Sequence, residues 1–87
     1  KRVDVRTTPQ KKMLALEKIK NFGKDSVAGL KCIEYRTRDG LKVILEDMSW
    51  FLVRASGTED LIRVYAESDN IKKLEDILLD VRSYLEI

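Results

Sequence analysis

The chain has 87 residues, of which 44% are hydrophobic and 37% charged, and its 17 basic and 15 acidic residues leave a net charge of +2. This length allows one domain around one modest core, and the small net charge does not indicate a nucleic acid or an anionic membrane as a partner. The sequence shows neither a signal peptide nor an apolar run of the roughly 18–20 residues that a membrane span needs, so we expect a cytoplasmic protein.

The N-terminal quarter predicts an extended lead-in followed by a helix. Residues 1–8 alternate weakly and indicate a short edge strand or an extended segment. Thr8 and Pro9 are typical of a helix start, with threonine as the N-cap and proline at the first helical position. Apolar residues then recur at helical spacing, so we expect a helix at about 9–22.

The middle of the chain predicts an antiparallel sheet. Asp39-Gly40 is a strong hairpin signal, and the connections between the apolar runs are short, which favours antiparallel neighbours. The run that begins at Trp50 is apolar on both faces, so we expect it to be a central strand. The four predicted strands cover residues 29–36, 41–46, 50–54 and 61–67.

A second amphipathic helix ends the chain, with Ser68 or Asp69 as its predicted N-cap and an apolar stripe that runs from Ile71 to Leu85. Two amphipathic helices need a sheet face to cover. The sequence therefore predicts a single domain, residues 1–87, of the α+β class: a two-layer sandwich in which two helices cover a four-stranded antiparallel sheet.

One short segment concentrates groups that bind anions. Arg54 offers a planar fork of donors that can meet two phosphate oxygens at once. Ser56 and Thr58 add hydroxyl groups, and Gly57 allows the backbone to curl and to aim its N–H groups at one point. Arg63 follows nine residues after Arg54. The alternative is an ordinary hairpin turn, because serine, glycine and threonine are favoured in turns anyway.

The chain shows no signature of catalysis. It has no histidine, which removes the commonest general base near neutral pH. Its carboxylates have no metal-ligand spacing, so we expect no metal site and no catalytic residue. Cys32 is the only cysteine and is expected to be a small buried hydrophobe.

The segment from Trp50 to Tyr65 resembles the phosphate-binding signature of the α-D-phosphohexomutases, R-x-S-G-T-E-P-x-x-R-V/I. These enzymes are the phosphoglucomutases, phosphomannomutases, phosphoglucosamine mutases and phosphoacetylglucosamine mutases. The resemblance extends over essentially all 87 residues, which match the C-terminal domain of this family in length and order of elements. The departure is Asp60, where many members have a proline that would stiffen the loop.

The resemblance implies a fragment of a longer four-domain enzyme, with a fold classed with TATA-binding-protein-like domains. A serine in the first domain would carry the phosphoryl group, and an aspartate-rich loop in the second would bind Mg²⁺. The fourth domain would hold the non-transferring phosphate of a glucose or mannose phosphate, or of the bisphosphate intermediate. Alone it would bind without catalysing.

Residue roles follow from the same resemblance. Arg54 would be the main phosphate clamp, Arg63 a second positive charge, and Ser56 and Thr58 hydrogen-bond donors, while Gly57 would let the backbone approach the phosphate. Glu59 would support the loop, because a carboxylate should not face a phosphate.

The rival interpretation is a stand-alone α+β module that binds a nucleic acid or another anionic ligand. It fits the order of elements. However, sheets that bind nucleic acids carry stacking aromatics on a basic face, and the strand residues that look exposed here mix both signs of charge. We therefore expect no nucleic acid and no membrane among the partners, which would be the sugar phosphate and the other domains of the enzyme.

Overall fold

The computed structural model describes residues 1–87 and contains six strands and two helices. In chain order these are β1 (Arg2–Arg6), α1 (Pro9–Lys20), β2 (Ser26–Val27), β3 (Leu30–Arg36), β4 (Leu41–Leu45), β5 (Trp50–Ala55), β6 (Leu61–Glu67) and α2 (Ile71–Leu85).

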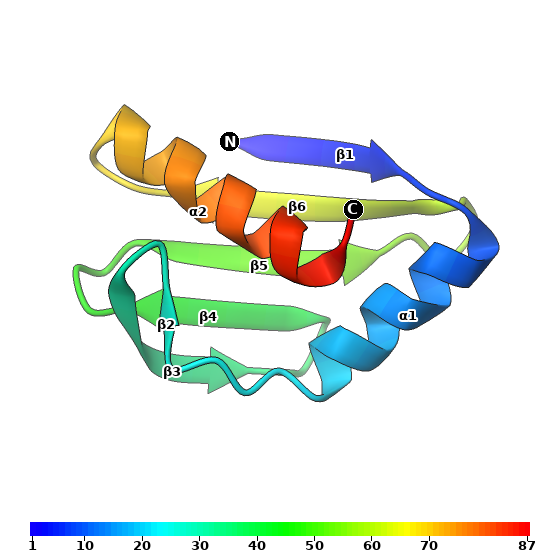
Figure 1. Cartoon of the computed structure of the whole chain (residues 1–87), viewed down its shortest axis with the longest axis horizontal. Helices are drawn as coiled ribbons and strands as arrows, with labels where there is room; N and C mark the ends of the chain where they lie inside the picture. Colours follow the sequence, from blue (N-terminus) through cyan, green and yellow to red (C-terminus); the bar gives the residue numbers. More distant parts are fainter.

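The strands form one antiparallel sheet in the order β1-β6-β5-β4-β3-β2. Both helices lie over the same face of this sheet (Figure 1). The predicted two-layer α+β class is therefore confirmed, but the prediction of four strands is wrong. β1 pairs with β6 along one edge, where the sequence alternates only weakly, and β2 adds two residues at the other edge within a segment predicted to be a loop.

The core lies between the helices and the sheet. β5 is an inner strand, as predicted, and its Phe51 and Val53 are fully buried on the helix-covered face. The next residues along the strand, Trp50 and Leu52, are half-buried on the opposite face, which no helix covers. β6 repeats the alternation, with Ile62, Val64 and Ala66 in the core, so each strand presents one set of side chains to the open face.

The N-terminus of each helix is capped by a side chain. Thr8 caps α1 as predicted, its Oγ1 accepting a hydrogen bond of 3.2 Å from the Lys11 N–H. α1 ends at Lys20, two residues before the predicted end. The cap of α2 is Asn70, which accepts from the Lys73 N–H, so the prediction of Ser68 or Asp69 is wrong. Ser68 accepts a hydrogen bond from the Asn70 N–H and so belongs to the turn before the helix.

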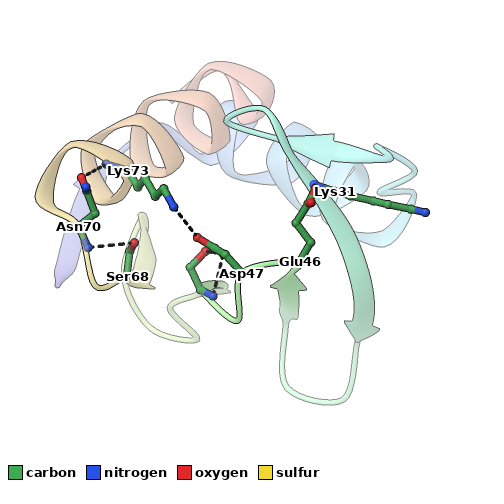
Figure 2. A network of polar contacts seen from close by, with 7 residues as sticks. Lys31, Glu46, Asp47, Ser68, Asn70 and Lys73 are labelled. Atoms are coloured by element: carbon green, nitrogen blue, oxygen red, sulfur yellow. Dashed lines mark hydrogen bonds and ion pairs between the residues drawn. The ribbon is translucent and has the colours of Figure 1, made fainter.

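The turn between β4 and β5 is tied to the start of α2. The Asp47 carboxylate accepts hydrogen bonds from the Ser49 N–H and hydroxyl, and it pairs with the Lys73 ammonium at 3.3 Å (Figure 2).

α1 buries fewer apolar residues than α2, whose buried residues are Ile77, Leu78, Val81 and Leu85. Ala15 and Ile19 are buried, whereas Met13, Leu14 and Leu16 are exposed. Neither helix combines the length and apolarity that crossing a membrane would require.

Candidate functional site

The loop of residues 56–60 joins β5 to β6 at one end of the sheet. The two strands remain paired up to Ala55 and Ile62, and the Ser56 N–H then donates to the Leu61 carbonyl at 3.0 Å. A regular hairpin therefore holds the loop at its base, and the position of the loop is set by the pairing of β5 with β6.

The Ser56 hydroxyl organises the loop from inside. Its side chain is buried, and Oγ accepts hydrogen bonds from the N–H groups of Thr58 (3.3 Å) and Glu59 (3.1 Å). Serine side chains commonly hold turns in this way. Two of the loop's N–H groups are thus used by Ser56, and its hydroxyl proton remains available to an acceptor.

The N-terminal segment anchors the far side of the loop. The Thr7 N–H donates to the Asp60 carbonyl at 2.9 Å, and the Lys12 ammonium donates to the Glu59 carbonyl at 2.8 Å. Figure 1 shows the end of β1, the start of α1 and the β5–β6 connection at the same end of the sheet. Glu59 and Asp60 therefore contribute to loop structure through their backbone carbonyl groups. The Asp60 backbone is anchored although this position lacks the proline of the signature that the segment resembles.

Gly57 and Thr58 form the exposed tip of the loop. The Gly57 N–H and the Thr58 hydroxyl make no hydrogen bond within the chain, so both are free to donate to a ligand. Gly57 does not have a positive φ, and a Cβ placed on it would meet no atom within 4 Å. The loop conformation thus does not require glycine there, and what the glycine leaves open is access to the backbone.

Arg54 and Arg63 are direct cross-strand partners on the open face. Like charges placed opposite each other in a sheet are destabilising unless a counter-charge lies between them. Arg54 is exposed and makes no hydrogen bond or ion pair. Arg63 is half-buried, its Nε has no hydrogen-bond partner, and the nearest carboxylate oxygen, Asp4 Oδ1, is 3.8 Å from this atom. The pair therefore carries unused donors beside the loop tip.

The structure brings the predicted residues Arg54, Arg63, Gly57 and Thr58 to one end of one hairpin. It places Ser56 beneath the tip, as a support that also retains one donor. Sequence analysis missed three residues that complete the surroundings. They are Asp4, Thr7 and Lys12. Only the pairing of β1 with β6 brings them close, so no local pattern could have identified them.

The open face also carries aromatic residues, which bears on the rival interpretation. Trp50 donates from Nε1 to the Glu67 carboxylate at 2.7 Å, and the Lys42 ammonium lies 4.4 Å from the centre of its ring. Both the edge and one face of the indole are therefore already engaged within the domain. A base would have to displace Lys42 to stack on this face of the ring.

The chemistry open to this site is anion binding. The groups at the loop are guanidinium, hydroxyl and amide donors, and no group of three or more histidine, cysteine or acidic side chains is arranged to hold a metal ion. Cys32 is distant in the core, where burial raises the pKa of its thiol, although a hydrogen bond with Tyr35 opposes this. None of these groups is arranged as a nucleophile with its base.

The chain matches known proteins over most of its length. Residues 3–83 match the family model described as the phosphoglucomutase/phosphomannomutase C-terminal domain. A probable phosphoglucosamine mutase of Methanobrevibacter smithii is 39% identical over 66 residues, which are 76% of this chain and 14% of that protein. A phosphoglucomutase/phosphomannomutase of Thermococcus kodakarensis is 45% identical over 51 residues, 59% of this chain and 9% of that protein. A phosphopentomutase of the same organism is 43% identical over 44 residues, 51% of this chain and 10% of that protein. The matched region is thus a small part of each relative.

Proposed function

This chain belongs to the phosphoglucomutase/phosphomannomutase C-terminal domain family, and on that premise we propose that its β5–β6 loop holds the non-transferring phosphate of a hexose phosphate. The ligand would be a glucose or mannose phosphate, or the corresponding bisphosphate. The domain binds and orients this phosphate, and the chemistry takes place on other parts of a longer enzyme.

The observation that carries this proposal is the Arg54–Arg63 couple at the loop end of the hairpin, in which Arg54 has no ion-pair partner and Arg63 has only a long contact of 3.8 Å with Asp4. A phosphate placed between them would neutralise the repulsion and would accept charge-assisted hydrogen bonds from both guanidinium groups. The Gly57 N–H, the Thr58 hydroxyl and the remaining proton of Ser56 would supply further donors. Lys12 is already committed to the Glu59 carbonyl, so it would contribute by charge alone.

The proposed ligand is defined by its phosphate because the relatives are named for different sugars. One is called a phosphoglucosamine mutase and another a phosphopentomutase. The chemical group common to these names is a sugar phosphate. A loop that binds phosphate oxygens serves each of them, so other parts of the enzyme would select the sugar ring.

Phosphoryl transfer would need residues outside this chain. No carboxylate cluster here fits Mg²⁺, so a magnesium ion, if the parent enzyme uses one, would be held by another domain and would supply electrostatic stabilisation of the transferred group. The contribution of these 87 residues is to fix one end of the substrate. Precise placement of a substrate can supply a large part of a rate enhancement.

A titration followed by NMR tests the proposal. Inorganic phosphate or glucose 6-phosphate added to the ¹⁵N-labelled chain should shift the amides of residues 54–60, with a Kd on the order of millimolar or weaker because the site lacks its other walls. Shifts over β3 and β4 with a single-stranded oligonucleotide, together with silence towards phosphate, would instead establish the nucleic-acid interpretation.

A further inference from the structure

We propose that Gly40, in the turn between β3 and β4, is a positioning residue for Arg54. The role rests on the proposed function, because it concerns the guanidinium that would grip the phosphate. Gly40 lies in a different hairpin from the β5–β6 loop. It has no side chain that could bind an anion, and it is not one of the proposed phosphate-binding residues.

The register of the sheet brings the two residues together. Leu41 is the cross-strand partner of Val53 in the antiparallel β4–β5 pair, and continuing that pairing by one residue sets Gly40 opposite Arg54. A Cβ placed on Gly40 would lie 3.0 Å from the Arg54 Cγ and 2.3 Å from the Val53 carbonyl oxygen. A Cβ at position 40 would therefore overlap the Val53 carbonyl oxygen and press against the aliphatic stem of Arg54.

The same row of the sheet explains why this space matters. Arg54 has Arg63 as its partner on one side and Gly40 on the other, and Arg63 in turn is the partner of Asp4. The row therefore consists of one acidic residue, Asp4, two arginines and a glycine without a side chain. Arg63 is drawn towards Asp4, and the stem of Arg54 rests over Gly40, so the two guanidinium groups can flank an anion.

Three requirements for glycine coincide at this position: a positive φ, the close Val53 carbonyl oxygen and the stem of Arg54. Gly40 has a φ of +105°, which disfavours any side chain whatever the space around it. Gly29 has a comparable φ of +76°, but a Cβ placed on it would meet no atom within 4 Å. Gly29→Ala therefore controls for the strain of a positive φ. The clash with the Val53 carbonyl oxygen is controlled by making Gly40→Ala in an Arg54→Ala background, where that clash remains and the Arg54 stem is absent.

The test compares phosphate binding by the wild-type chain, Gly40→Ala and Gly29→Ala, each shown to be folded by its amide spectrum. We expect Gly40→Ala to raise the Kd for inorganic phosphate at least about tenfold, the loss of about one charge-assisted hydrogen bond. Gly29→Ala should change it less than about twofold. In a chain that already carries Arg54→Ala, the Gly40→Ala change should weaken binding no further.

The outcomes separate the two proposals. A wild-type chain that ignores phosphate would overturn the proposed function and this role with it. A wild-type chain that binds phosphate, beside a folded Gly40→Ala chain that binds equally well, would overturn the positioning role alone. If Gly40→Ala does not fold, the contact between Gly40 and Arg54 is tested in the wild-type chain by NMR. A nuclear Overhauser effect between the Gly40 Hα and Arg54 Hγ protons that persists under saturating phosphate supports the role, and its absence refutes it.

Discussion

Ser56 is the residue on which the shape of the site depends. Its side chain is buried and accepts from two backbone N–H groups of the loop, while the loop tip at Gly57 and Thr58 stays exposed. A motif that suggests a row of phosphate donors from its sequence is thus divided in the structure into an internal support and an external tip.

Replacing Ser56 by alanine should therefore act first on stability. We expect Ser56→Ala to lower the free energy of unfolding by about 1 kcal/mol, because the Thr58 and Glu59 N–H groups lose their acceptor and the loop loses its turn. Urea denaturation measures the change. Thr58→Ala is the matched control, since its hydroxyl has no partner in the chain, and should alter the free energy of unfolding by less than about 0.5 kcal/mol. Equal losses in both variants would show that Ser56 does not organise the loop.

How far the site could be predicted depends on sequence distance. Arg54, Gly57 and Thr58 belong to one contiguous motif, and the predicted hairpin brings Arg63 near Arg54, so local reasoning reaches all four. Asp4 and Gly40 come from other strands or turns, and their places follow only from the sheet order and register. The like-charge pairing of the two arginines is likewise a matter of register, which motif spacing alone did not fix.

At the scale of elements, the turn between β4 and β5 shows how the layers are joined. Asp47 in this turn accepts from the Ser49 hydroxyl and N–H, and it pairs with Lys73 of α2 (Figure 2). The side-chain hydrogen bond from Ser49 is the main reason that the pKa of Asp47 is lowered, and it outweighs the opposing effect of burial. The ionised carboxylate thus links a sheet turn to the first turn of a helix.

This contact predicts an acid-sensitive component of stability. A carboxyl group whose pKa is lower in the folded state stabilises the fold above its unfolded pKa of about 3.9, and this contribution disappears as the pH falls through the lowered folded value. We expect the free energy of unfolding to decrease below about pH 4, and to decrease less in Asp47→Asn. Denaturant unfolding at several pH values provides the measurement. Asp39→Asn, at an exposed turn position without hydrogen bonds, should keep the wild-type profile. An unchanged profile for Asp47→Asn would contradict the assignment.

The elements that sequence reasoning missed are the ones with little pattern. β2 has two residues, and β1 gains its partner from the far end of the chain, so neither leaves a strong local signal. The cap of α2 was misplaced because Ser68, Asp69 and Asn70 are all good caps, and only the backbone decides among them. β6 and the inner position of β5 were predicted correctly. Long alternating runs, and runs that are apolar on both faces, are compatible with few structures other than a strand.

At the scale of the whole molecule, the sheet and the N-terminal segment together position the β5–β6 loop. Both helices cover one face of the sheet, and β1 is the edge strand beside β6 (Figure 1). The other face, with its row of Asp4, Arg63 and Arg54, is left open. The N-terminal segment then reaches the loop through Thr7 and Lys12. A domain of this size builds no deep cleft around the loop, so we expect the isolated chain to bind phosphate weakly.

Titration of folded Arg54→Ala and Arg38→Ala variants with glucose 6-phosphate tests most directly whether the β5–β6 loop grips a phosphate. Both substitutions remove one exposed arginine at the same end of the sheet and change the net charge equally, but only Arg54 is the cross-strand partner of Arg63. We expect Arg54→Ala to weaken binding about tenfold to a hundredfold while its thermal unfolding stays close to that of the wild type, and we expect Arg38→Ala to bind almost as the wild type does. Equal affinities in the two variants would contradict the proposed grip, because binding would then depend on overall charge and not on Arg54.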